Sequence, residues 1–411
     1  MAENVPAGKV VEAFAMYHFG IVSEKMKTLK IDMDIPTNKP ATACKENMEH
    51  DHTYRSLNDS RNEHKSEYVE EEKAQDEIRE LKIQNELISN ELSVLKEKLS
   101  YPKVCFENMQ GLDNVVQLHT GLQSCGLFMW LLKHVRPAAE HIQYLKGSNT
   151  SEPRSSETSK RGPQRSLSIA NELLLTLMKL KQNINENYLA YLFSVSPSHV
   201  SSVFGTWVLL LAKVISCLIY FPSRAEIVQH YPACYKRWRY ICAIIDCFEI
   251  PTERPSHVAA NTQIFSAYKN KTTVKFLLAC TPGGTVSFIS EPAGGNMSDK
   301  EIVLGSGLLD KFSPGDKCLA DKGFRLQGEF MERGVELITP PFVQGGKPFT
   351  EEENKLNKAI THARIHVERV IGRVRDYEYL NGTIPITHFD IVGPAVLVCC
   401  ALTNLKPSVV P

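Results

Sequence analysis

The chain lacks several features that would place it in a specialised class. Its 11 cysteines include no Cys-x-x-Cys pair, which argues against a disulfide framework and against a closed zinc site. No segment reaches the ~18–20 uninterrupted apolar residues that cross a bilayer. The nearest, 208–221, is broken by Lys213 and Ser216. The first residues also lack the layout of a secretory signal peptide. We therefore expect an intracellular chain without a membrane segment.

A net charge is missing as well, because 47 basic residues balance 47 acidic ones. Any nucleic-acid surface must therefore arise from local segregation of charge. The 411 residues suggest two or three units at ~150 residues each. A hydrophobic content of 43% is sufficient for a substantial core.

Three acidic residues carry most of the functional information. Asp246 ends the apolar run 241–246, Asp321 ends the run 317–321, and Glu368 lies in a helix-like stretch. Singly, each has an ordinary explanation as a turn former or an ion-pair member. Together, in the order strand, strand, helix, they predict a site for hard cations such as Mg²⁺, which prefer oxygen ligands. Two such ions ~3.5–4 Å apart can promote phosphodiester cleavage, so we predict a metal-dependent nuclease core.

Folding has to bring these three carboxylates together, because 75 and 47 residues separate them. Crowded carboxylates repel one another when no metal is bound. We therefore expect at least one of them to have a raised pKa.

The sequence segments around these residues support a more specific interpretation. The segments 245–255, 294–302, 319–324 and 366–372 resemble the DDE superfamily endonucleases, specifically the Harbinger-type transposases and their domesticated relatives. The resemblance is strong over 245–405 and moderate over 101–240. It implies an α/β, ribonuclease-H-like fold with a mixed sheet, whose strands we expect near 240–246, 274–280, 285–290, 317–321 and 335–339. It also implies that Asp246, Asp321 and Glu368 are catalytic ligands of Mg²⁺ or Mn²⁺.

A further motif that carries the same resemblance is Gly294-Gly295 followed by Asp299. Asp299 is either an auxiliary metal ligand or the cap of the helix 300–309, and we favour the cap.

Residues 166–220 show a helix-turn-helix layout, with a short helix 186–193, a turn 194–196 and a helix from Pro197. Ser196 suits the N-cap, and Pro197 suits the first turn. The layout resembles the helix-turn-helix that precedes the nuclease domain in the same family, where the second helix enters the major groove. We expect four exposed residues on this helix, with His199 as a DNA contact: Ser198, His199, Ser201 and Ser202. Because the helix has few basic residues to bind phosphates, a helical buttress is the alternative.

A basic surface is predicted near Glu368, where 355–376 holds six basic residues against two acidic ones. At helical spacing they form a face for the DNA backbone next to the metal ligands. The predicted contacts are Arg364, Arg369, Arg373 and Arg375.

The N-terminal part divides into a disordered segment 1–60, a coiled coil 61–100, a helical accessory region 101–146 and a flexible linker 147–165. Residues 74–99 follow a heptad pattern, with Ala74, Leu81, Ile88 and Leu95 at d and Ile78, Asn85, Leu92 and Leu99 at a. A single Asn at an a position fixes a parallel two-stranded register, so we predict a homodimer through 74–99.

A short motif precedes the heptad pattern, Asp51-His52-Thr53-Tyr54. It resembles the tetrapeptide by which several transcription regulators, including THAP-type proteins, bind host cell factor. The region therefore looks THAP-like, although the Cys and His ligands of a THAP finger are absent.

The leading function is a transposase-derived, divalent-metal-dependent DNA endonuclease. Water and then a DNA 3′-hydroxyl would attack the phosphodiester. The alternative is a domesticated DNA-binding or transcriptional adaptor protein that keeps the fold without catalysis. Either function places the chain in the nucleus.

Overall fold

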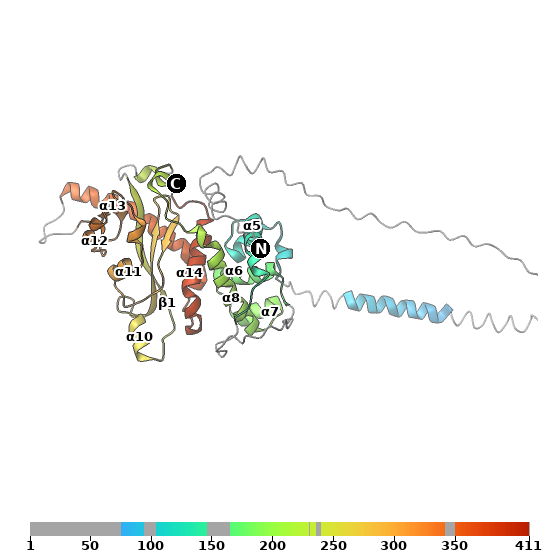
Figure 1. Cartoon of the computed structure of the whole chain (residues 1–411). Helices are drawn as coiled ribbons and strands as arrows, with labels where there is room; N and C mark the ends of the chain where they lie inside the picture. The colour runs from blue at the N-terminus through green and yellow to red at the C-terminus, as the bar shows by residue number, and fades with distance from the viewer. Residues whose placement is uncertain are drawn as a thin grey trace, which may run out of the picture. The chain divides into compact units, whose positions relative to one another are not determined.

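The computed structural model describes residues 75–93, 104–145, 165–229, 231–235, 240–341 and 350–410. The chain divides into two compact units. The smaller one spans Thr28–Lys103, and the larger one includes Val104–Pro411. In the smaller unit, residues 75–93 form a helix whose residues are all exposed (Figure 1). The predicted helix of the coiled coil is therefore present over these residues, whereas Ala74, Leu95 and Leu99 lie outside the described residues.

The larger unit begins with helices. They are η1 (Phe106–Met109), α4 (Asp113–Thr120), α5 (Cys125–Ala139), α6 (Ile169–Gln182), α7 (Glu186–Phe193) and α8 (Pro197–Ile215), followed by η2 (Ser216–Leu218) and α9 (Arg224–Gln229). Serine side chains cap three of them. Ser196 caps α8 and Pro197 is its first residue, which confirms the predicted start of this helix.

Seven strands form one mixed sheet within the described residues. They are β1 (Ile241–Pro251), β2 (Phe265–Ser266), β3 (Lys271–Cys280), β4 (Val286–Ile289), β5 (Ala293–Gly294), β6 (Lys317–Leu319) and β7 (Glu336–Ile338). Their order is β2-β3-β1-β6-β7, with β4 and β5 also pairing with β3. The five predicted strands correspond to β1, β3, β4, β6 and β7. The strands β2 and β5 are too short to show a pattern in the sequence.

The first strand differs from its prediction. The apolar run predicted a strand ending at Asp246, but β1 continues to Pro251 because it stays paired with β3 as far as Thr273. Phe248 and Ile250, in the continuation, are buried on one face of the strand. Asp246 therefore lies within the strand and not at its end.

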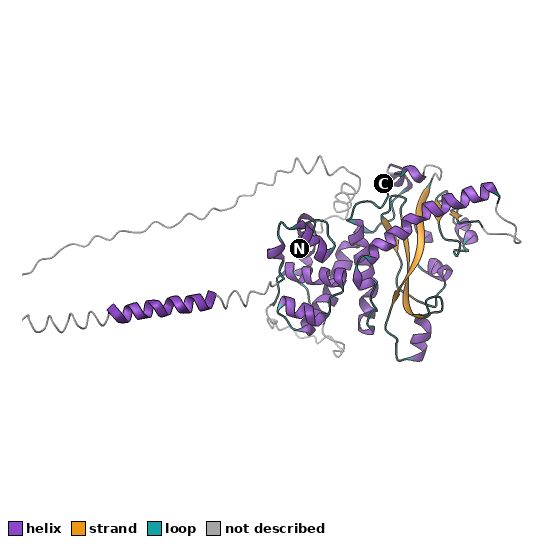
Figure 2. Ribbon diagram, turned by 180° about the vertical axis from the view of Figure 1, so that it is seen from behind, coloured by secondary structure: helices purple, strands orange, loops and turns teal. Residues whose placement is uncertain are grey.

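Helices cover both faces of the sheet. On one face lie α13 (Glu351–Arg375) and α14 (Phe389–Asn404), whose apolar residues share a core with α6 and α8. Figure 2 shows α13 running across the strands. On the other face, α11 (Asp299–Gly305) and α12 (Gln327–Glu332) enclose a second core. The remaining elements are η3 (Ala233–Tyr235), α10 (Val258–Ile264), η4 (Leu309–Lys311), η5 (Glu378–Leu380) and η6 (Ile386–His388).

Two segments of the described chain, Pro197–Leu218 and Ile386–Asn404, are long and apolar enough to cross a membrane. In this fold they belong to α8 and α14, which pack against each other in the larger core. A core helix meets the same criterion of length and composition.

The mixed sheet with helices on both faces is the expected α/β, ribonuclease-H-like architecture, with further helices upstream.

Candidate active site

The parallel pair β1 and β6 positions the two aspartates. Ile244 of β1 lies opposite Leu319, the last residue of β6. Asp246 and Asp321 each follow two residues further along the chain. Because both strands run in the same direction, the two carboxylates lie at the same edge of this pair.

Helix α13 brings the third carboxylate to this edge. The helix begins with a capping box between Thr350 and Glu353, and its buried apolar positions pack on the sheet. Glu368 lies on the exposed side of the helix. Arg364 lies one turn earlier and is mostly buried.

Arg364 connects the carboxylates. Its Nη1 lies 2.9 Å from Oδ1 of Asp321, and its Nη2 lies 3.9 Å from Oε1 of Glu368. Its charge also acts on Asp246, as do the charges of Asp321 and Glu368. The charges of the three predicted acidic residues therefore act on one another and on Arg364. Arg364 was predicted as a DNA contact.

Burial is the main reason that the pKa of Asp246 is raised to about 6. The Arg364 charge and a hydrogen bond from the Cys247 backbone N–H oppose this rise, while repulsion from Asp321 and Glu368 adds to it. The expected raised pKa is confirmed for Asp246. Its expected cause was wrong, because desolvation outweighs the repulsion between carboxylates.

The donor set fits a hard divalent cation by chemistry, since carboxylate oxygens from a rigid sheet edge and a helix are its usual ligands. The spacing fits less well. No group of three His, Cys, Asp or Glu side chains in the described part of the chain is close enough to hold a metal ion. In this arrangement the positive charge among the carboxylates is the guanidinium of Arg364.

The raised pKa has a consequence for stability. Both folded and unfolded chains protonate Asp246 below about pH 4. Between about pH 4 and 6 the unfolded chain ionises first, so the folded state bears a penalty that is complete above about pH 6. Asp246→Asn should therefore stabilise the metal-free protein at about pH 7.5 by about 1–3 kcal/mol, and the gain should shrink towards about pH 4.5. Urea unfolding at both pH values checks this.

The matched control is Asp390→Asn, which removes an exposed carboxylate at the start of α14. It should change the free energy of unfolding little at either pH. Equal stabilisation by the two variants would refute the effect of burial.

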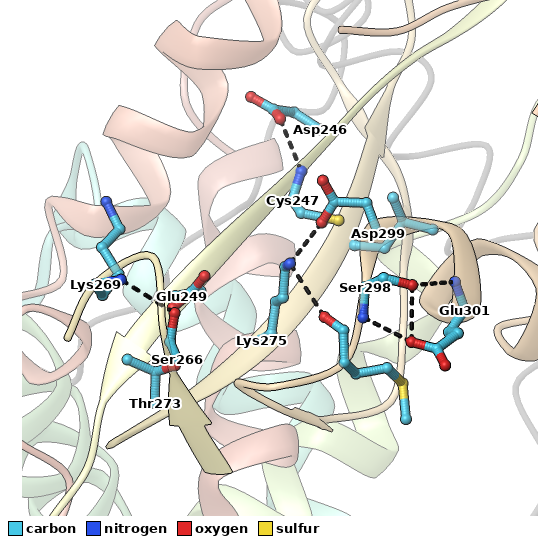
Figure 3. A network of polar contacts seen from close by, with 12 residues as sticks. Asp246, Cys247, Glu249, Ser266, Lys269, Thr273, Lys275, Ser298, Asp299 and Glu301 are labelled. Carbon is cyan, nitrogen blue, oxygen red and sulfur yellow. Dashed lines mark hydrogen bonds and ion pairs between the residues drawn. The ribbon is translucent and has the colours of Figure 1, made fainter. Parts of the chain in front are cut away.

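Asp299 does not cap its helix. Ser298 is the N-cap of α11 and forms a capping box with Glu301, as Figure 3 shows. The Asp299 carboxylate instead pairs with Lys275 at 2.6 Å and contacts Cys247. The predicted cap was one residue too late. Because Cys247 follows Asp246 in the strand, its side chain points to the opposite face, and the auxiliary role of Asp299 stays a prediction.

The four predicted basic DNA contacts have different surroundings. Arg373 donates to the carbonyls of Pro407 and Ser408, and Arg375 donates to the carbonyl of Glu249 at 2.9 Å. These two side chains thus hold the C-terminal segment and β1. Arg369 is exposed on α13, and DNA contact stays a prediction for it.

The second helix of the helix-turn-helix exposes only part of the predicted surface. Ser198 and Ser201 are exposed. His199 is half-buried: its Nε2 is hydrogen-bonded to the Ser166 hydroxyl at 2.8 Å, and its ring packs near Tyr144. Ser202 is half-buried and donates to the Leu145 carbonyl. The expected exposure of His199 and Ser202 was therefore wrong, because the segment 142–145 packs on this helix.

A buried carboxylate in the helical region was missed in the sequence. Glu172 of α6 is fully buried and accepts hydrogen bonds from the Tyr144 hydroxyl and from Trp207 Nε1, the latter at 2.8 Å. Arg165 lies 3.5 Å from it. Burial and the Glu172 carboxylate raise the pKa of Tyr144 to about 12. No pattern marked Glu172, since its partners are distant in the sequence.

The predicted partner motif Asp51, His52 and Tyr54 lies outside the described residues.

Family comparison identifies two regions of the chain. Residues 245–404 match the DDE superfamily endonuclease family, and residues 165–217 match the helix-turn-helix of DDE superfamily endonuclease. The chain thus carries a DDE superfamily endonuclease domain together with its upstream helix-turn-helix. The first match includes Asp246, Asp321 and Glu368. No curated protein is similar enough to match the chain.

Proposed function

We propose that the protein is a divalent-metal-dependent DNA endonuclease in which Asp246, Asp321 and Glu368 bind Mg²⁺ or Mn²⁺. The observation that supports this proposal is the parallel register of β1 and β6, in which Ile244 pairs with Leu319, so that each aspartate follows a paired residue by two positions. Arg364 on α13 lies near both Asp321 and Glu368. When bound, the metal would activate water and stabilise the leaving oxygen of a phosphodiester.

The chain's own residues have distinct parts in this proposal. Asp246 is held within β1, and Asp321 follows the last residue of β6 by two positions, so that little ordering of Asp246 is needed when the metal binds. Glu368 approaches from the exposed side of α13, where a DNA backbone has access. Arg369, exposed next to it, can bind a phosphate and hold the strand near the carboxylates.

The test is a nicking assay of the purified full chain on supercoiled DNA with Mg²⁺, Mn²⁺ or a chelator. We expect cleavage with either metal and none with the chelator. Cleavage that persists in the chelator would contradict metal dependence.

The same protein preparation distinguishes the endonuclease from the adaptor alternative. DNA binding in a mobility shift assay with no cleavage under any metal condition would favour a protein that keeps the fold without catalysis. The helix-turn-helix supports DNA binding in both cases. Nuclear location follows from a DNA substrate, and host cell factor binding through Asp51–Tyr54 stays a prediction.

We also propose that the helix 75–93 pairs with a second copy. Its seam residues are half exposed in the single chain: Ile78, Leu81, Ile88 and Leu92. In a parallel pair, Asn85 would meet its counterpart across the seam, and each amide would have a partner. Asn85→Leu should raise the melting temperature of the dimer while loosening the choice of oligomer. Thermal melts followed by circular dichroism give the melting temperature, and analytical ultracentrifugation of residues 61–100 and of the full chain gives the oligomeric state.

Monomers of both at micromolar concentration would exclude the homodimer. Glu80, an exposed residue outside the predicted seam, provides the control. Glu80→Gln should change neither the oligomer nor its melting temperature.

A further inference from the structure

Arg364 is held in an unusual way for a buried arginine. Its side chain is only 11% exposed, yet one nitrogen alone has a close carboxylate, Asp321 at 2.9 Å. The contact with Glu368, at 3.9 Å, is long. Its Nε is buried without a hydrogen-bond partner in the described part of the protein. A buried donor without a partner costs free energy, so this position of the guanidinium is a compromise.

Arg224 shows what a structural arginine looks like in the same protein. Its Nε and Nη2 both donate to Asp316, at 2.9 and 2.6 Å, and Nη2 also donates to the Pro314 carbonyl at 2.9 Å. Two nitrogens thus donate to one oxygen, Oδ1 of Asp316, and charge-assisted hydrogen bonds of this kind are strong and fix the pair. Arg364 lacks this arrangement, which indicates that its partners are suited to another cation.

The charges explain which cation that is. Arg364 contacts Asp321 and Glu368, and its charge also acts on Asp246, so these four residues together keep an excess of negative charge with Arg364 in place. A small divalent cation can contact several carboxylate oxygens at once, which the planar guanidinium does not do here. Two cations near the same oxygens also repel each other.

We propose that Arg364 is an internal counter-cation that competes with the divalent metal for Asp321 and Glu368, so that the guanidinium must leave these carboxylates when the metal binds. The inference rests on the proposed function, because it takes these carboxylates as metal ligands. Arg364 is thus a positioning residue. It limits repulsion in the metal-free protein, and its displaced guanidinium stays on α13 at the edge where DNA would lie.

The test measures metal affinity without DNA or catalysis. Mn²⁺ is titrated calorimetrically into the full chain, as wild type, Arg364→Met, Arg364→Lys and Lys311→Met. Methionine keeps much of the buried stem and removes the charge, while lysine keeps the charge. We expect Arg364→Met to bind Mn²⁺ roughly tenfold more tightly, a change of about 1.4 kcal/mol. Arg364→Lys should stay near wild type. Lys311→Met, which removes an exposed positive charge in η4 outside the site, should equal wild type.

A second measurement separates competition from a purely structural effect. Without metal, Arg364→Met should melt at a lower temperature than wild type, and Mg²⁺ should raise its melting temperature by more than it raises that of wild type. Adding Asp321→Ala should remove the gain in Mn²⁺ affinity. If Arg364→Met does not fold, Arg364→Gln tests the same prediction, because glutamine is uncharged and still offers a hydrogen bond to Asp321.

The outcomes distinguish the two levels of the argument. If Arg364→Met binds Mn²⁺ no more tightly than wild type does, the competition is refuted and the proposed metal site stands. If neither wild type nor any Arg364 variant binds Mn²⁺, both the competition and the proposed function are overturned.

Discussion

Asp321→Ala should lower the rate of DNA cleavage by at least ~10³-fold, equivalent to about 4 kcal/mol of transition-state stabilisation. The reason is that Asp321 stands at the shared edge of β1 and β6 and has no substitute there. Its neighbour at that edge, Asp246, comes from the other strand. The side chain of Asp321 is 48% exposed, so its removal leaves no cavity, but the mostly buried Arg364 loses its close carboxylate. We therefore expect a lower melting temperature, with DNA binding retained. The nicking assay, a mobility shift assay and a thermal melt measure the three properties on one preparation.

A carboxylate of the same helix that bears Glu368 provides the control. Glu352 lies exposed in the first turn of α13, several turns from Arg364. Glu352→Ala removes the same charge and should cleave at close to the wild-type rate. If Asp321→Ala retained cleavage within a few-fold of Glu352→Ala, the assignment of Asp321 as a ligand would be wrong.

Glu172→Ala should destabilise the larger unit by about 3–5 kcal/mol, because it strands several buried groups at once. Trp207 Nε1 and the Tyr144 hydroxyl would lose their acceptor, and Arg165 would lose its nearby carboxylate. Glu172 connects the segment after α5, the helix α6 and the helix α8. Its removal should therefore destabilise the whole helical region. Urea unfolding followed by tryptophan fluorescence is suited to this measurement, because Trp207 itself contacts Glu172.

The control here is Glu107→Ala. Glu107 is exposed in η1 and makes only a 3.4 Å contact with Asn171, a residue one position before Glu172. We expect a change below about 0.5 kcal/mol for it. A similar small change for Glu172→Ala would show that water replaces the lost carboxylate and that the network contributes little.

Features that depend on neighbouring residues were predictable from the sequence. The start of α8 follows from Ser196 and Pro197, whose capping chemistry is local. The strands β1, β3 and β6 follow from apolar runs, and the order of the three acidic residues follows from where those runs end. The extension of β1 to Pro251 could not be predicted in this way. It depends on pairing with β3, which lies more than twenty residues later.

The same distinction applies to the candidate site. The i, i+4 spacing of Arg364 and Glu368 was visible in the sequence, but the closer contact of Arg364 is with Asp321, 43 positions earlier. The surroundings of Arg373 and Arg375 were hidden for the same reason. Their partners are carbonyls of the C-terminal segment and of β1, and a sequence shows no pattern for a backbone acceptor.

The packing of α8 on α14 limits how this protein can be re-engineered. Asn404, at the end of α14, hydrogen-bonds both backbone groups of Val286 in β4 and also the Leu218 carbonyl beyond α8. The helix-turn-helix and the endonuclease sheet are therefore built into one core and are not separable modules. Grafting another helix-turn-helix in place of 165–217 would require redesign of α14. A change of DNA target is more readily sought at solvent-facing positions such as Ser198 and Ser201, where substitutions leave the shared core unchanged.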